Sequence, residues 1–101
     1  MNDKVLSLLG LAARGRNLVS GEFSVEKAVK EGKANLVVVS SDASENTRKK
    51  FTNMCSFYKT PVYIYSTKEQ LGRAIGREMR SSAAVTDHGM AVNIIKHLEE
   101  S

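Results

Sequence analysis

The residues with the clearest chemical potential lie in one short segment, residues 20–32. An apolar stripe at helical spacing runs along it, formed by Val25, Ala28 and Val29. At about 100° per residue, Phe23, Lys27 and Lys30 project from the opposite face. An exposed aromatic ring beside two cations suits nucleic acid, and the backbone N–H groups of a helix start suit a phosphate. The alternative is that Phe23 packs beneath a neighbouring loop and that the lysines form an ordinary solvated face.

Basic residues gather in three further places along the chain. They are Arg14 and Arg16, the run Arg48-Lys49-Lys50, and the set Arg73, Arg77 and Arg80. In the last place, we expect Gly72 and Gly76 to loosen the end of a helix before a polar loop. The loop reads Met79-Arg80-Ser81-Ser82. Such a loop can pack on an unstacked base and bind sugar or phosphate. An ordinary polar connection is the alternative here, and a solvated helix face is the alternative for residues 48–50.

Sequence signatures of enzymes are absent. The chain has no phosphate-binding loop of the form G-x-x-x-x-G-K-[ST], and residues 72–76 lack the third glycine and preceding strand of a dinucleotide site. His88 and His97 have no second ligand at metal-binding spacing, so we interpret both as solvated helix histidines. Cys55 falls on an apolar helix stripe, which indicates a buried structural thiol. We therefore expect no catalytic residue, no metal and no cofactor.

Length and composition bound the class of protein. The 101 residues suffice for one domain with a single core, and a hydrophobic share of 42% indicates a folded globular chain. No apolar run approaches the ~20 residues that cross a membrane, and the start of the chain lacks the features of a signal peptide. A single cysteine fits a reducing compartment, so we expect a cytoplasmic protein. The net charge of +4 permits binding to a polyanion without requiring it.

Helical and extended patterns alternate along the chain and define the elements that position these residues. Strands are predicted at residues 17–20, 36–39, 62–65 and 82–86. Helices are predicted at residues 3–13 and 20–32, around the stripe of Phe51, Met54, Cys55 and Tyr58, after a capping box at residues 67–70, and after Asp87. The expected N-caps include Asn2 or Asp3 for the first helix and Asp42, with Glu45, for the third; Gly15 and Gly32 are expected to end helices. Because apolar strands alternate with helices, we expect a three-layer α-β-α sandwich.

Several stretches together resemble a known family. Residues 21–32 are similar to its signature helix, Gly-x-Asn-Glu-x-x-Lys-x-x-x-x-Gly, and residues 36–42 to the strand and acidic exit that follow. Residues 71–78 are similar to its Leu-Gly-x-Ala-x-Gly box, and residues 82–85 to its small-residue strand. This is the L-seven-Ae / L-thirty-e group of ribosomal proteins, which bind kink-turn RNA. Residues 9–16 resemble its bacterial ribosomal-protein-like subgroup, and the resemblance covers nearly the whole chain.

The resemblance implies a fold, a function and a site. The fold is an α-β-α sandwich with a four-stranded mixed sheet, here a single RNA-binding domain at residues 1–101. The implied function is non-enzymatic binding of structured RNA, above all ribosomal RNA, with ribosome association as in many members. In the family, the Asn-Glu pair reads the sheared G·A pairs of the kink-turn, the lysine contacts phosphate and base, and the loop after the glycine box covers an extruded base. Carried over, the predicted RNA-binding residues are Gly21, Glu22, Phe23, Ser24, Lys27, Arg77, Met79, Arg80 and Ser81.

Phe23 and Ser24 stand where the family has Asn and Glu, and this is a departure from its pattern. Phe offers no hydrogen bond to a base edge, and Ser offers one short hydroxyl in place of a carboxylate. Each lost base-edge pair removes about 1–3 kcal/mol of discrimination. Stacking of Phe23 on a base recovers a similar amount, about 1–3 kcal/mol, with little sequence preference. We therefore expect an RNA surface whose kink-turn specificity is weakened or altered.

Two other classes of function stay open at this point. A protein-interaction module of the same fold would dock a partner through Phe23 and the third helix. Absence of salt-dependent RNA binding would favour that class. An RNA-recognition domain of a modifying enzyme, found alone, is the third class, for which no catalytic constellation is visible.

Overall fold

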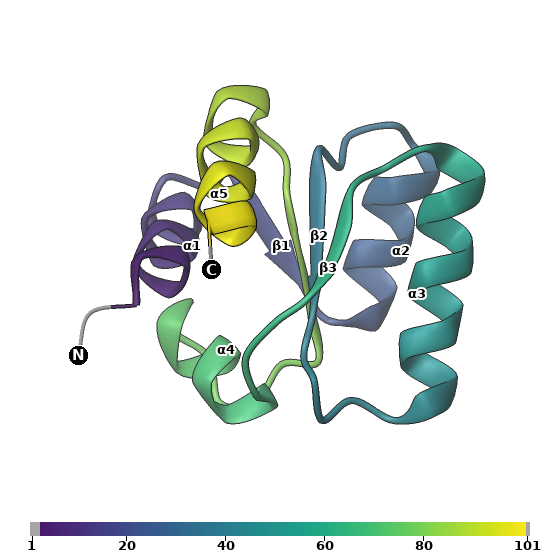
Figure 1. Ribbon diagram of the computed structural model, residues 1–101, viewed down its shortest axis with the longest axis horizontal. Coiled ribbons are helices and arrows are strands. Elements are labelled where there is room, and N and C mark those ends of the chain that lie inside the picture. The colour runs from purple at the N-terminus through teal and green to yellow at the C-terminus, as the bar shows by residue number, and fades with distance from the viewer. Residues whose placement is uncertain (1–2, 101) are drawn as a thin grey trace.

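A mixed sheet forms the centre of the protein, and the computed structural model describes residues 3–100 of it (Figure 1). The strands are β1 (Leu18–Ser20), β2 (Leu36–Val39), β3 (Val62–Ile64) and β4 (Ser82–Val85). The helices are α1 (Lys4–Arg14), α2 (Glu22–Lys30), α3 (Glu45–Tyr58), α4 (Lys68–Ala74) and α5 (His88–Glu100). The predicted alternation of helices and strands is confirmed for this part of the chain.

The four-stranded sheet has the order β1-β4-β2-β3. Strand β4 runs antiparallel to both of its neighbours, while β2 and β3 are parallel. Val85 lies opposite Leu18 on one side and opposite Leu36 on the other. Helices α2 and α3 cover one face, and α1, α4 and α5 cover the other (Figure 1). The three-layer sandwich with a mixed sheet is therefore confirmed.

The central strands β2 and β4 are buried on both faces, which explains the unbroken apolar sequence of β2 and the small residues of β4. Val37 and Val39 pack with Phe51 on the side of α2 and α3. Leu36 and Val38 pack on the other side, against residues of α1, α4 and α5. Alternate residues of the same strand therefore contribute to two separate cores.

Side-chain caps fix where most helices begin. Asp3 caps α1, because its carboxylate accepts a hydrogen bond from the Leu6 backbone N–H at 3.0 Å. Thr67 and Gln70 form the predicted capping box of α4. Asp87 accepts from the Met90 N–H at 2.8 Å at the start of α5. These predictions are confirmed, and Asn2 lies outside the described residues.

The predicted capping role of Asp42 in α3 is wrong. A turn follows β2, in which the Ala43 N–H donates to the Ser40 carbonyl at 3.2 Å, so that α3 begins at Glu45. Ser44 is its N-cap and accepts from the Thr47 N–H at 3.1 Å. The Asp42 carboxylate accepts from the Lys68 N–H at 2.9 Å, and chiefly this bond lowers the pKa of Asp42. Asp42 therefore ties the exit of β2 to the start of α4.

Helix α1 ends as expected at Gly15, although the glycine does not supply the left-handed turn. Gly15 is the C-cap with φ −86°, and the next residue, Arg16, has φ 61°.

In the described part of the chain, no helix is both long and apolar enough to cross a membrane.

Candidate nucleic-acid interface

The start of α2 is joined directly to the start of β4. The Gly21 N–H donates to the Ser82 carbonyl at 3.1 Å, and the Gly21 carbonyl accepts from the Val25 N–H at 3.0 Å. Gly21 has φ 94°, a conformation that residues with a Cβ rarely adopt. This glycine therefore lets the chain leave β1 and enter α2 at once, while the helix start stays fixed to the sheet.

The connection between α4 and β4 lies against the same end of the sheet. The Arg80 side chain donates from Nε to the Ser20 hydroxyl at 3.1 Å and from Nη1 to the Met79 carbonyl at 2.9 Å. The Arg80 N–H donates to the Lys68 carbonyl at 3.1 Å. Arg80 thus holds residues 79–80 beside the end of β1, one residue before Gly21.

Gly72 does not loosen this connection, contrary to the sequence-based expectation. A Cβ on Gly72 would lie 1.9 Å from the Glu78 carbonyl oxygen and 3.0 Å from the Met79 Cα. The Gly72 carbonyl also accepts from the Arg77 N–H at 2.7 Å. The segment from Arg77 to Met79 therefore packs tightly on α4, because position 72 has no side chain. Gly76 differs from Gly72, because it has φ 77° and open space around it.

The outer face of α2 presents an aromatic ring and a cation to solvent. The side chain of Phe23 is 80% exposed, so it does not pack beneath a loop. Ser24 and Lys27 are exposed beside it. A shallow groove of about 340 Å³ runs along this face and is lined by Phe23, Glu26, Lys27, Lys30 and Glu31. Met79, in the neighbouring connection, is 59% exposed.

Ion pairs between α2 and α3 leave Lys27 as the cation available on this face. Lys50 of α3 contacts the carboxylates of Glu22 and Glu26 at 2.8 and 2.7 Å, and Lys30 contacts Glu26 at 2.7 Å. Hydrogen bonds from Lys30 and then Lys50 lower the pKa of Glu26 to about 2. Among residues 3–100 no ion pair involves Lys27. Lys50 is thus not the simply solvated lysine that the basic run suggested.

The remaining predicted residues lie around the same end of the molecule. Glu22 belongs to the first turn of α2, with its carboxylate directed to Lys50. Arg77 is exposed in the connection before β4, and the Ser81 carbonyl accepts from the Ser40 N–H at 2.8 Å. Sequence reasoning missed Ser20, whose hydroxyl positions Arg80. Its place at a strand end carried no signal of that contact.

Metal ligands and the Cys55 thiol are the other groups of the described residues with chemical potential. Within residues 3–100, no group of three or more His, Cys, Asp or Glu side chains could hold a metal ion. Cys55 is buried between α3 and the sheet, and burial raises the pKa of its thiol to about 11. The prediction of a buried structural thiol is confirmed.

Comparison with known proteins assigns the chain to a family. The sequence profile described as the Ribosomal protein L7Ae/L30e/S12e/Gadd45 family matches residues 3–95. The chain belongs to this family. The resemblance drawn from its motifs is therefore correct.

Two relatives carry the name "RNA-binding protein YlxQ". The protein from Bacillus subtilis (strain 168) is 47% identical over 92 residues, which cover 91% of this chain and 92% of that protein. The protein from Enterococcus faecium is 34% identical over 89 residues, which cover 88% of this chain and 85% of that protein.

Two solved structures share the fold. A protein with unknown function from Bacillus halodurans C superposes with a TM-score of 0.94 at 43% identity, over 97% of this chain and 99% of that one. The Giardia lamblia 15.5kD RNA binding protein superposes with a TM-score of 0.83 at 23% identity, over 99% of this chain and 92% of that one. At that identity the second likeness shows the common fold alone.

Proposed function

We propose that this protein binds structured RNA of the kink-turn class through the start of α2 and the connection between α4 and β4. The observation that carries the proposal is the junction of these two segments. The Gly21–Ser82 backbone bond and the Arg80–Ser20 side-chain bond hold an exposed ring, a cation and an exposed methionine at one end of the sheet. The names of the YlxQ relatives support RNA as the ligand.

The RNA contact that each residue makes follows from the chemistry of its side chain. Phe23 stacks on an unpaired base, Lys27 neutralises a phosphate, and Met79 packs on an extruded base. The free N–H groups at the start of α2 add a site for a second phosphate. Base-edge reading is weak at this surface, because Phe23 cannot hydrogen-bond and Ser24 supplies a single hydroxyl. We propose ribosomal RNA as the target and association with the ribosome as the cellular role.

A gel-shift comparison tests the relaxed specificity. The two RNAs are a standard kink-turn and the same RNA with its sheared G·A pairs replaced. We expect both to bind with affinities within about tenfold, because stacking and phosphate contacts do not depend on those pairs. Strong discrimination between the RNAs would show that Phe23 and Ser24 still read the kink-turn.

A second experiment tests the RNA target. Crosslinking in cells, followed by sequencing of bound RNA, is expected to enrich one ribosomal RNA site. Purified protein that binds no RNA with a salt-dependent affinity would contradict the proposal and favour a protein-interaction module instead.

A further inference from the structure

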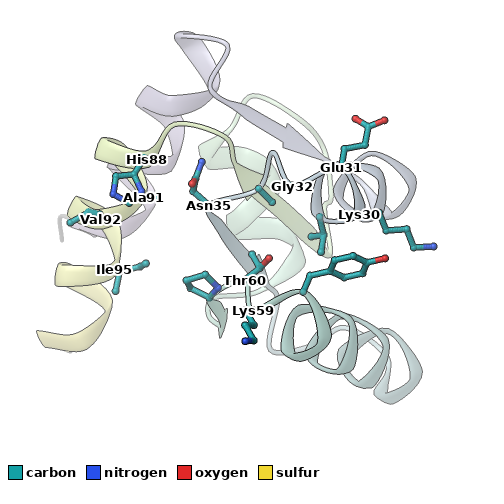
Figure 2. A pocket seen from close by; sticks show the side chains of 14 residues that line it. Lys30, Glu31, Gly32, Asn35, Lys59, Thr60, His88, Ala91, Val92 and Ile95 are labelled. Carbon is teal, nitrogen blue, oxygen red and sulfur yellow. The ribbon is translucent and has the colours of Figure 1, made fainter.

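A second concave site lies at the opposite end of the sandwich (Figure 2). Its volume is about 550 Å³, within the range of about 300–1,000 Å³ typical of small-ligand sites. It forms where α2 and α3 end and α5 begins, at the top of the view in Figure 1, whereas the candidate interface lies where α2 begins. The RNA contacts proposed above do not involve it.

The walls of this end pocket combine an aromatic ring with apolar surface. Tyr58, the last residue of α3, lines it with a side chain that is 42% exposed. Pro61 contributes from the start of β3, and Val92 and Ile95 contribute from α5. A ring that is open to solvent beside aliphatic surface suits a flat, partly polar ligand, because such a ligand can stack on one side and pack on the other.

Hydrogen-bonding groups lie between these walls. In Figure 2, Asn35 and Thr60 stand between the α5 residues on one side and Lys30 and Glu31 on the other. The Asn35 amide makes one long bond, from Nδ2 to the Lys33 carbonyl at 3.4 Å, and its Oδ1 accepts none among the described contacts. The Asn35 amide, with its Oδ1 unused, and the Thr60 hydroxyl match the mixed donors and acceptors of a nucleobase edge.

The charged side chains at the rim of the end pocket allow a phosphate to bind there. Lys59 is exposed and forms no ion pair within residues 3–100, and His88 lines the rim from α5. The one carboxylate that lines the pocket, Glu31, is paired with Lys33 at 3.4 Å. The local balance of charge is therefore not repulsive to an anion.

The α2 groove connects the end pocket with the candidate interface. Lys30 and Glu31 line both the groove and the pocket, and Phe23 lines the groove at its other end. Lys30 follows Phe23 by seven positions, which is roughly 10 Å along a helix. Glu26 lies on this path, but two lysines neutralise it. An RNA strand that stacks on Phe23 therefore meets no unpaired carboxylate before it reaches the pocket.

We propose that the end pocket binds an unpaired nucleotide of an RNA strand that continues from the candidate interface along the outer face of α2. Tyr58 stacks on the base, Asn35 and Thr60 bond its edge, and Lys59 contacts the phosphate. This inference rests on the proposed function, since the strand enters from the first site.

Affinity measurements with extended RNAs test the proposal. The set comprises a kink-turn RNA alone, the same RNA with a single-stranded extension of about six nucleotides on either strand, and a version with that extension base-paired. We expect one single-stranded extension to tighten binding about fivefold or more at fixed salt, the lower end of what one base–aromatic stack contributes. Tyr58→Ala should abolish this gain and leave affinity for the unextended RNA unchanged. Tyr58→Phe should retain the gain.

Phe57 provides a matched control for Tyr58. Its side chain is 79% exposed, it does not line the pocket, and its ring contacts that of Tyr58 with centroids 5.0 Å apart. Phe57→Ala and Tyr58→Ala both remove this ring pair, but only the second removes the stacking surface. The proposal is overturned if neither single-stranded extension tightens binding, if the paired extension gives the same gain, or if both alanine variants lose it equally.

Failure of the proposed function would be seen separately. The unextended RNA reports the first site alone, so its binding without any gain from an extension rejects only the end pocket. If the unextended RNA does not bind, a short single-stranded oligonucleotide titrated into the protein decides the pocket directly. Backbone NMR shifts at Gly32, Asn35 and Thr60 would support it, and unchanged spectra at these residues would reject it.

Discussion

Replacing Gly72 by alanine tests whether tight packing at this position holds the connection that carries Met79 and Arg80. The new Cβ would lie 1.9 Å from the Glu78 carbonyl oxygen. A Cβ atom essentially never lies within 3.0 Å of another non-bonded heavy atom, so the Glu78 backbone would have to move by about 1 Å. Overpacking of this kind costs about 1–3 kcal/mol, and the better helix propensity of alanine returns at most about 1 kcal/mol. We expect a net loss of about 1–2 kcal/mol in the free energy of unfolding.

Denaturant unfolding and RNA affinity are the two assays for Gly72→Ala. Each kcal/mol lost should lower Tm by about 4–8 °C in a domain of this size. Affinity for a kink-turn RNA without an extension should fall as well, because the displaced backbone carries Met79 and Arg80. Gly32→Ala is the matched control. The φ of 74° at this position imposes strain of about 1–2 kcal/mol on an alanine, but no atom lies within 4 Å of the added Cβ. The first site is at the other end of α2. The reasoning is refuted if Gly72→Ala is as stable as the parent, or if it loses stability without losing RNA affinity.

Four further predictions concern single side chains. Lys27→Ala should weaken binding to all RNAs and reduce the slope of log affinity against log salt concentration by about one, with Lys96→Ala on α5 as the unaffected control. Phe23→Ala should weaken binding without reducing this slope. Unchanged affinity would exclude either residue from the interface. Because the pKa of Glu26 is lowered in the folded protein, its contribution to stability is present above pH 4.5 and is lost as pH falls toward about 2. Glu26→Gln should therefore lower stability at neutral pH and flatten the acid-unfolding curve between these two pH values. Cys55 should react with a thiol reagent only at the rate of unfolding, and fast labelling of native protein would contradict its burial and raised pKa.

Most of the fold could be predicted from local sequence patterns. The apolar stripe of α2 gave both the helix and the exposure of Phe23, because side-chain direction in a helix follows from spacing alone. The unbroken valines of β2 indicated a strand covered on both faces, and the two cores of the sandwich bear this out. The caps Asp3, Thr67 and Asp87 lie within three residues of the groups they bind, so spacing sufficed to identify them.

Contacts between segments that are far apart in the sequence could not be predicted from it. Asp42 has the spacing of a cap for α3, yet it bonds Lys68, because the turn after β2 brings its carboxylate to the start of α4. Gly72 looked like a flexible hinge, and only the packed backbone of Glu78 shows that it is a close approach. The Arg80–Ser20 bond joins residues 60 positions apart. These contacts depend on the tertiary arrangement, which no local pattern encodes.

The position of β4 in the sheet has a consequence for the synthesis of the protein. Among the four strands of residues 3–100, β4 comes last in the sequence but lies between β1 and β2, so Leu18 has no strand partner until Val85 has been made. The bond from Gly21 to Ser82 closes at the same stage. Pairing over such sequence distances is slow to form, because the loop between the strands must close first. A nascent chain that lacks β4 therefore cannot present the interface, and the protein becomes competent to bind only after Val85 has been made.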